Sequence, residues 1–183
     1  MFFSLQVLGK RAIDFGEEFR PGVIDLGSEA RQRGTLTSSG RATLVTERHG
    51  HKGVIQDIRV VGTLATAVEQ TCARCLEPVV HELSKSFDLL YRPLGSDAGR
   101  EEMSVTQVEA EISYYQGDGL LLEDVLREQT LLALPMRVVC SEECKGLCRS
   151  CGHNLNLGPC SCPAPAADPC WTALQGLREK LER

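Results

Sequence analysis

Six of the nine cysteines in this 183-residue chain fall between Cys140 and Cys162, in the stretch CSEECKGLCRSCGHNLNLGPCSC. At its centre, Cys148 and Cys151 are separated by two residues, and Gly152 follows them. Two thiolates at this spacing can bind one tetrahedral ion from a single tight turn, and the glycine permits the positive φ that turns backbone N–H groups toward the sulfurs. The stretch therefore predicts a closed metal site, with zinc as the ion.

The same stretch has too few large apolar side chains to fold by burial alone. Leu147, Leu155 and Leu157 are its large aliphatic residues, and burying one such side chain stabilises a fold by about 1.5 to 3 kcal/mol. Ordering the backbone costs on the order of 1 to 2 kcal/mol per residue, whereas a structural zinc contributes roughly 10 to 16 kcal/mol of apparent binding free energy in small peptides. We therefore expect the ion to order residues 140–162, and its removal to leave the earlier part of the chain folded.

Spacing alone does not select four ligands from these six thiols. A loop has to turn back on itself to close a tetrahedron, and residues 154–159 are long enough to do so. Cys140 or Cys162 could replace an end member of the ligand set. The predicted ligands are Cys144, Cys148, Cys151 and Cys160.

Cys72 and Cys75 form a further pair in the sequence TCARCLEPV. A second metal half-site is one interpretation, because the eight cysteines other than Cys170 would then fill two sets of four. A redox pair is another, although such a pair favours a helix start, which the following Pro78 makes unfavourable here. Two ordinary turn thiols are the third.

Composition and charge exclude several classes of protein. The net charge of −5 argues against a protein that coats nucleic acid through a general basic field. No apolar run approaches the roughly 18 residues of a membrane span, and the first residues lack the features of a secretory signal. We therefore expect a cytoplasmic protein, and in that reducing compartment nine thiols are more typical of metal ligands than of a disulfide framework.

The strand and turn pattern predicts an α+β fold with a mainly antiparallel β meander. β-Branched residues favour strands over 35–47, 54–71 and 79–91, with Val80, Leu83 and Phe87 facing the core. A further strand is predicted over 109–115, and short strands over 1–8 and 23–26.

One amphipathic helix is predicted over residues 120–134, with Asp118 as its cap and Pro135 at its end. Its apolar positions recur three and four residues apart: Leu122, Val125, Leu126, Gln129, Leu132 and Ala133. The predicted organisation is a β-rich body over 1–135, a cysteine-rich zinc-knuckle loop over 136–165 and a C-terminal helix over 166–183.

The sequence lacks the motifs of an enzyme. There is no HExxH, no phosphate-binding glycine loop and no Gly-x-Ser-x-Gly elbow. Four thiolates on one ion also leave no open position for water, which a catalytic zinc needs. We therefore expect a protein without catalytic activity and without a small-molecule substrate.

Several motifs in their order resemble the bacterial YceD family, also called the large ribosomal RNA subunit accumulation proteins. These are CARCLEPV, then FDLLYRP, LLLEDVLREQTLLALPM and CKGLCRSCGHNLNLGPCSC, and finally DPCWTALQGL. The resemblance runs from about Val60 to the C-terminus and is most specific in the CxRCL turn and the GLCxxCGxNLN loop. It implies a cytoplasmic, non-enzymatic factor needed for accumulation of 23S ribosomal RNA and assembly of the large ribosomal subunit.

Three mechanisms are compatible with such a role. In the first, Arg74, Lys145 and Arg149 contact phosphates of the precursor ribosomal RNA. In the second, the zinc-stabilised loop is an adaptor that docks a ribosomal assembly protein. In the third, oxidation of the thiolates ejects the zinc, so that the loop is a redox-sensitive switch.

Overall fold

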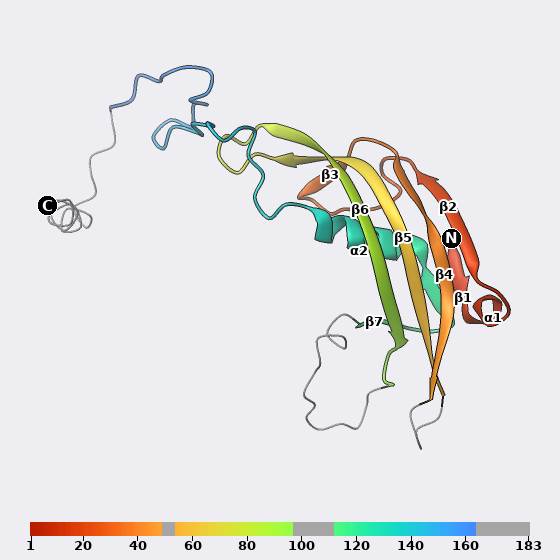
Figure 1. Cartoon of the computed structure of the whole chain (residues 1–183). Helices are drawn as coiled ribbons and strands as arrows, with labels where there is room; N and C mark the ends of the chain where they lie inside the picture. The colour runs from red at the N-terminus through yellow and green to blue at the C-terminus, as the bar shows by residue number, and fades with distance from the viewer. Residues whose placement is uncertain (49–53, 97–111, 164–183) are drawn as a thin grey trace, which may run out of the picture. The chain divides into compact units, whose positions relative to one another are not determined.

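The computed structural model describes residues 1–48, 54–96 and 112–163 (Figure 1). The chain divides into two compact units, the first made of Met1–Ala73 with Glu77–Cys140 and the second of Arg74–Leu76 with Ser141–Arg183. The predicted C-terminal helix over 166–183 lies outside the described residues.

The first unit consists of strands and two helices. Its main sheet has six strands in the order β2-β4-β5-β6-β7, with β3 also paired to β5, and β1 pairs with β8 in a small second sheet. No helix in the described residues is both long enough and apolar enough to cross a membrane. The elements are β1 (Phe2–Ser4), α1 (Leu5–Leu8), β2 (Ile13–Phe19), β3 (Ala30–Gln32), β4 (Leu36–Arg48), β5 (Val54–Thr71), β6 (Pro78–Pro93), β7 (Ile112–Tyr115), β8 (Gly119–Leu121) and α2 (Leu122–Ala133).

The predicted antiparallel meander is confirmed in β4, β5 and β6, which pair in sequence order. The further strand predicted over residues 109–115 is present as β7 (Ile112–Tyr115), but β7 pairs parallel to β6. Strand direction depends on the path of the connecting chain, which the strand's own residues do not encode. The strand predicted over residues 23–26 is wrong. Ile24 and Leu26 are buried there, but they lie in a bend and in an irregular segment, and not in a strand.

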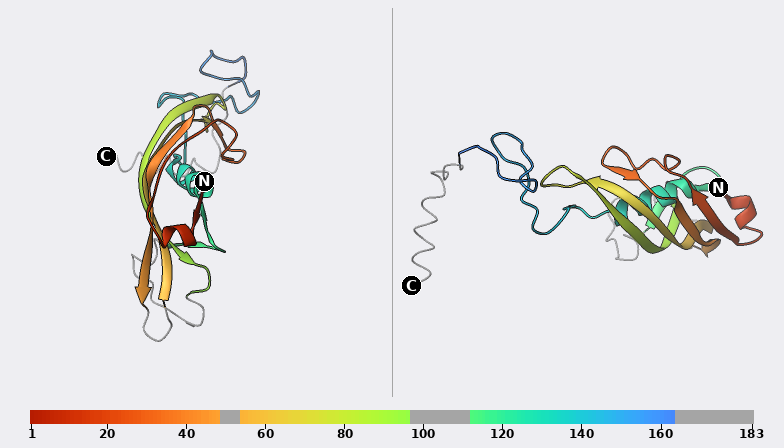
Figure 2. Two further views of the ribbon diagram at one scale, coloured as in Figure 1. Left: turned by 90° about the vertical axis from the view of Figure 1, so that its right-hand side faces the viewer. Right: turned by 90° about the horizontal axis from the view of Figure 1, so that it is seen from above.

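The helix α2 covers one face of the sheet, which curves around it in the left view of Figure 2. Its buried residues include Leu122, Val125 and Leu126, as the apolar spacing predicts, but Leu132 is exposed. The predicted cap is also wrong, because the N-cap residue is Leu121 and not Asp118. The end of the helix follows the prediction: Leu134, which precedes a proline, has an extended ψ of 136°.

Alternation along β5 decides which face of the sheet is buried. Even-numbered residues from Ile58 to Val68 point toward the core, while Arg59 and Val61 are exposed. On β6, Leu83 and Phe87 share the buried face, as predicted. Val80 is 54% exposed, so its predicted core position is wrong. The reason is the period of two, which places Val79, and not Val80, on the same face as Leu83.

One row of residues across four strands explains two glycines inside the sheet. The pairing aligns Phe15 with Gly40, Gly40 with Gly62, and Gly62 with Phe87. A Cβ added to Gly40 would meet the carbonyl oxygen of Val61 and would lie 2.7 Å from the ring of Phe15. The glycines thus allow close backbone approach, and the two phenylalanine rings cover the space that their missing side chains leave.

Asp57 and Arg92 form a buried ion pair next to the Ile58–Tyr91 pair of β5 and β6. Their side chains are 0% and 7% exposed, and Nη2 of Arg92 lies 2.8 Å from Oδ2 of Asp57. Removing one partner of a buried pair is costly, because the other charge stays buried without its counter-ion.

We predict that Gly40→Ala lowers the free energy of unfolding by about 1 to 3 kcal/mol, because the added methyl group has no space between β4 and β5. Gly16→Ala on β2 is the matched control, since a Cβ there meets nothing within 4 Å. Chemical denaturation followed by circular dichroism measures both changes. Equal effects of the two substitutions would contradict the packing argument.

We also predict that Asp57→Ala lowers the free energy of unfolding by about 3 to 5 kcal/mol. Asp88→Ala removes a carboxylate from the exposed Arg59–Asp88 pair and should cost about 0 to 1 kcal/mol. The same denaturation experiment compares the two variants. A loss no larger for Asp57→Ala than for Asp88→Ala would show that burial of the first pair is unimportant.

Candidate metal centre

The loop around Cys148 and Cys151 folds as the predicted tight turn. The backbone N–H of Cys148 donates to the carbonyl oxygen of His153 (2.8 Å), and that of Gly152 donates to the carbonyl of Cys148 (2.9 Å). Gly152 has a φ of 73°, as the sequence predicts. Leu147 and Asn154 form a β-bridge on either side of the turn. The second unit therefore presents the two thiols from a closed, hydrogen-bonded loop.

Four sulfurs of this unit gather at one place. Those of Cys148, Cys151, Cys160 and Cys162 all lie within 4.8 Å of one another, which makes a group that could hold a metal ion. Sulfurs around a tetrahedral zinc with bonds of about 2.3 Å lie roughly 3.8 Å apart. The group is thus close to the size that a zinc ion needs.

The structure divides the cysteines differently from the predicted ligand set. It brings Cys148, Cys151 and Cys160 together, but it completes this group with Cys162 and not with the predicted Cys144. Sequence spacing could not distinguish Cys144 from Cys162, because both are near enough along the chain to reach the Cys148–Cys151 turn.

The thiols of the group around Cys148 strongly affect one another's protonation. Backbone N–H groups of Cys151 and Ser150 lower the pKa of Cys148 to about 6. Contact with the Cys151 thiol, burial and the nearby Cys148 raise the pKa of Cys162 to about 12. The backbone N–H of Cys162 lowers the pKa of Cys160. The Cys148 thiol and burial together raise it by more, so the net shift of the pKa is upward.

One thiolate therefore forms readily in this group, while further ionisation is unfavourable beside it. A divalent cation removes this conflict, because four thiolates around it are stabilised by its charge and are deprotonated on binding. The donor set is soft sulfur in a closed arrangement, which suits zinc.

Two asparagines hold the loop in place, and the sequence reasoning missed them. The side-chain oxygen of Asn156 accepts a hydrogen bond from the backbone N–H of Lys145 (2.8 Å), and its Nδ2 donates to the sulfur of Cys144 (3.3 Å). Nδ2 of Asn156 also donates to Oδ1 of Asn154 (2.9 Å). The signal for this role is the alternation Asn-Leu-Asn directly after the CxxCGH turn.

Arg74, which the sequence suggested as a phosphate contact, bonds to the protein itself. Its Nη1 donates to the carbonyl oxygens of Glu142 (2.9 Å) and Cys144 (3.0 Å). Its own carbonyl accepts the backbone N–H of Leu147 (3.1 Å). The guanidinium thus fastens the loop that precedes Cys148.

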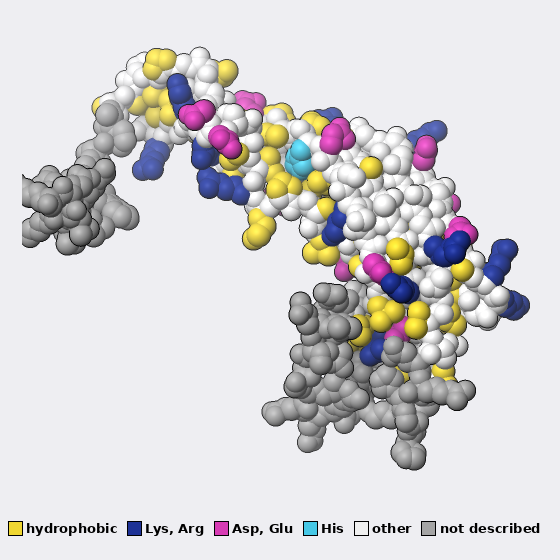
Figure 3. All heavy atoms as spheres, viewed as in Figure 1, with side chains coloured by type: hydrophobic (Ala, Val, Ile, Leu, Met, Phe, Trp, Pro, Cys, Tyr) yellow, Lys and Arg dark blue, Asp and Glu magenta, His cyan; other side chains and the backbone are white. Residues whose placement is uncertain are grey.

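Lys145 and Arg149 are exposed and line a hollow of about 400 Å³ beside the cysteines. Its apolar lining comes from Leu147, Leu155 and prolines 159 and 163, and the described residues that line it include no Asp or Glu. By contrast, acidic and basic side chains are interspersed on the face of the first unit seen in Figure 3.

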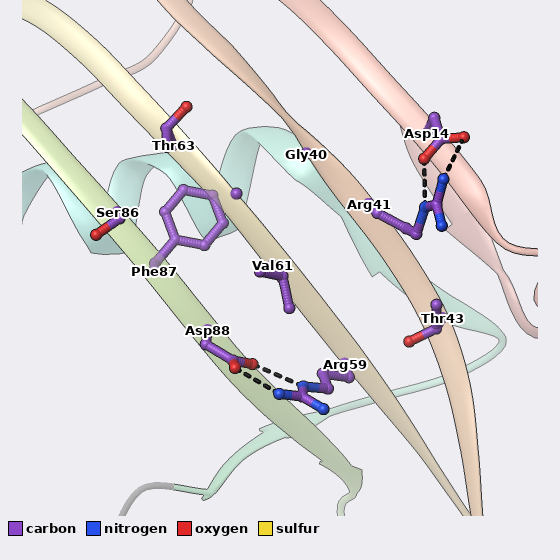
Figure 4. Close-up of a pocket in the computed structure, with 11 residues that line it drawn as sticks. Asp14, Gly40, Arg41, Thr43, Arg59, Val61, Thr63, Ser86, Phe87 and Asp88 are labelled. Carbon is purple, nitrogen blue, oxygen red and sulfur yellow. Dashed lines mark hydrogen bonds and ion pairs between the residues drawn. The ribbon is translucent and has the colours of Figure 1, made fainter.

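The first unit has a larger hollow on the sheet, between β2 and β6, where charges are already paired (Figure 4). Arg41 binds Asp14, and Arg59 binds Asp88 through two nitrogens. The hydrogen bond from Arg59 lowers the pKa of Asp88. Both arginines are therefore held by carboxylates of neighbouring strands.

Comparison with protein families gives one match, which covers residues 60–178 and is described as "Large ribosomal RNA subunit accumulation protein YceD". An uncharacterized protein of Mycobacterium leprae is 27% identical over 126 residues, which cover 69% of this chain and 55% of the relative. An uncharacterized protein of Mycobacterium tuberculosis is 30% identical over 123 residues, or 67% of this chain and 56% of the relative.

A protein of Zea mays, named as a chloroplastic homolog 1 of the large ribosomal RNA subunit accumulation protein, is 27% identical over 163 residues. That match covers 70% of this chain and 53% of the relative. The chain thus spans about half the length of the relatives that it matches along most of its sequence. No solved structure matches.

We predict that a zinc chelator abolishes the order of the loop around Cys148 and leaves the sheet folded. Hydrogen exchange by mass spectrometry should show loss of protection at residues 147–155 and retained protection in β5, with recovery after zinc is restored. The reason is that β5 is held by a buried core, whereas the loop contributes few apolar contacts. Loss of protection in both regions, or in neither, would contradict this division.

Proposed function

Because this chain belongs to the YceD family, the large ribosomal RNA subunit accumulation proteins, we propose that it supports accumulation of 23S ribosomal RNA during assembly of the large subunit and catalyses no reaction. The gathering of four sulfurs in the second unit carries the mechanistic part of this proposal. It supports a role in which a rigid loop binds a partner in the cytoplasm.

A zinc ion on Cys148, Cys151, Cys160 and Cys162 would supply the rigidity. The ion would hold four thiolates in closed coordination and fix the backbone between them. The hydrogen bonds of Asn156 and Arg74 then orient the segment that leads into the turn. This chain's own contribution is a preformed surface, since the exposed residues of the loop would be held in place before a partner binds.

Local contact with precursor ribosomal RNA is the mechanism that the charges favour. Lys145 and Arg149 are exposed and line one hollow without an acidic neighbour, so they can meet phosphates. The apolar lining beside them suits an unstacked base, as in other zinc-containing RNA-binding modules. With a net charge of −5, such contact has to be local. Arg74 is a weaker candidate, because it already donates to two backbone carbonyls.

An adaptor for a ribosomal assembly protein is the second candidate. The observation that favours it is Leu157, whose side chain is 79% exposed in the same loop. Large exposed apolar side chains on a rigid loop are typical anchors of protein interfaces. In this mechanism Lys145 and Arg149 offset the −2 charge of a zinc ion with four thiolates.

A redox-sensitive zinc switch is the third candidate, and it is favoured by the exposure of Cys151. An oxidant can reach an exposed thiolate, and oxidation to a disulfide or sulfenic acid removes a zinc ligand. Zinc release by mild peroxide, followed by zinc uptake after reduction, distinguishes this mechanism from the other two.

We predict that Lys145→Ala together with Arg149→Ala weakens binding to fragments of 23S precursor RNA. Loss of two phosphate contacts should reduce the slope of log affinity against log salt by roughly 1.4 to 1.8. The matched control is Lys10→Ala with Arg11→Ala, a pair of exposed basic residues in the first unit, which should leave the slope unchanged. Gel-shift titrations between 50 and 200 mM salt, about the range over which phosphate contacts change affinity strongly, measure both.

An unchanged slope in the Lys145 and Arg149 variant would exclude RNA contact through these residues. The adaptor mechanism makes a different prediction, in which Leu157→Asp abolishes co-purification of an assembly protein and leaves the RNA affinity unchanged. Both variants should keep their zinc, because neither changes a sulfur ligand.

A further inference from the structure

The hollow of about 400 Å³ beside the four gathered sulfurs lies within the second unit alone. The described residues that line it all fall between Lys145 and Pro163. Pockets that hold a small ligand measure about 300 to 1,000 Å³, so this hollow has room for a single nucleotide and not for a stacked run of bases. Its size therefore limits the ligand to one small group.

The lining combines apolar and cationic side chains, which is the combination that a nucleotide needs. Leu147 and Leu155 are only partly buried by the protein, and with Pro159 they give the hollow apolar walls. Lys145 and Arg149 are exposed beside them. Every nucleobase has a flat face that can pack on such walls, and a guanidinium can stack on a base or bind a phosphate. The hollow thus complements both the base and the phosphates of RNA.

The backbone donors in the walls of the hollow are already used by the loop itself. The N–H of Cys148 donates to the carbonyl of His153 (2.8 Å), and that of Leu155 donates to the carbonyl of Gly146 (2.9 Å). The backbone N–H of Ser150 donates to the sulfur of Cys148. A base in this hollow would therefore be held by packing and not read by these main-chain groups, so the site should accept different bases.

A base reaches such a hollow only after it has left its stack. In an A-form duplex the bases are paired and stacked, and the deep, narrow major groove keeps side chains away from them. Extruding a base has a free-energy cost, which is least where the strand is already single. Single-stranded loops and ends are therefore the form of RNA that fits this hollow.

We infer that the hollow binds one unstacked nucleobase of single-stranded RNA, while Lys145 and Arg149 contact the neighbouring phosphates. This inference rests on the proposed contact with precursor ribosomal RNA, and it names the form of RNA that the site takes. The base supplies apolar contact that a bare phosphate chain lacks, so the two can be distinguished by affinity.

Affinity for two oligomers of equal length and charge tests the inference on the full chain, purified under reducing conditions with zinc in the buffer. The first is short oligo(A), and the second is the same ribose-phosphate chain without bases. Fluorescence anisotropy should show that oligo(A) binds about fivefold more tightly, near the low end of what stacking of one base contributes. Oligo(A) annealed to oligo(U) should bind more weakly than the single strand at about 150 mM salt, where long-range charge effects are screened.

Variants of the hollow locate the base. Leu155→Ser changes an apolar wall and should reduce the preference for oligo(A) over the chain without bases, while the salt slope stays the same. Leu157→Ser is the matched control and should keep the preference, because Leu157 is 79% exposed in the same loop and is not among the described residues that line the hollow. Zinc content shows whether each variant is folded. Pro159→Ser changes another wall residue and replaces Leu155→Ser if that variant loses its zinc.

The outcomes separate this inference from the proposed function. Equal affinity for the two oligomers, or equal affinity for single strand and duplex, would overturn the base-binding hollow and leave phosphate contact by Lys145 and Arg149 in place. An effect of Leu157→Ser as large as that of Leu155→Ser would do the same. Binding of neither oligomer would overturn both the inference and the proposed RNA contact.

Discussion

The long antiparallel pairing of β5 with its neighbours is the interaction on which the rest of the first unit depends. β5 spans Val54–Thr71 and pairs with β4 over one part and with β6 over most of its length. This pairing aligns the inward residues of three strands into one buried face, which α2 covers. It also fixes where the sheet ends, because β5 stops at Thr71 and β6 begins at Pro78. The Cys72–Cys75 turn is therefore the hairpin connection itself.

The two parts of the chain obtain their order by different physical means. The first unit buries many large side chains, among them Phe3, Leu36 and Ile58, and such burial is the main favourable term in folding. In the loop around Cys148, Leu157 is exposed and Leu147 is only partly buried. Hydrogen bonds of Asn154, Asn156 and Arg74 and the proposed coordination of sulfur take the place of a core there.

The sequence predicted the parts of the structure that follow from local periodicity. β-Branched residues in period two located β4, β5 and β6, and the three-to-four spacing located α2. It missed β2, whose buried Phe15 and Phe19 are four residues apart with charged residues close by, and it could not show that β7 runs parallel to β6. The helix cap was wrong because Asp118 lies in the turn before β8, where its carbonyl accepts the N–H of Leu5.

For the candidate site, sequence spacing identified the cysteines but not their grouping. Proximity along the chain favoured Cys144 as a ligand beside Cys148, whereas the structure brings Cys162 to that turn. Both Cys144 and Cys162 are close enough along the chain to reach the turn, so the path of the loop decides between them, and local pattern cannot show that path. The roles of Asn156 and Arg74 were missed for the same reason, since each depends on a partner chosen by the fold.

The buried Asp57–Arg92 pair has a consequence for misfolding. Two long strands such as β5 and β6 can also pair in a shifted register, which would be a misfolded state if it were stable. A shift of β6 by one residue would turn Leu83 and Phe87 to the outside. A shift by two residues keeps the faces, but it would separate Asp57 from Arg92 and move Phe87 off Gly62. The first shift is unfavourable because it exposes apolar side chains, and the second because it breaks the buried ion pair. We therefore expect the β5–β6 hairpin to form in its native register, without a stable shifted register beside it.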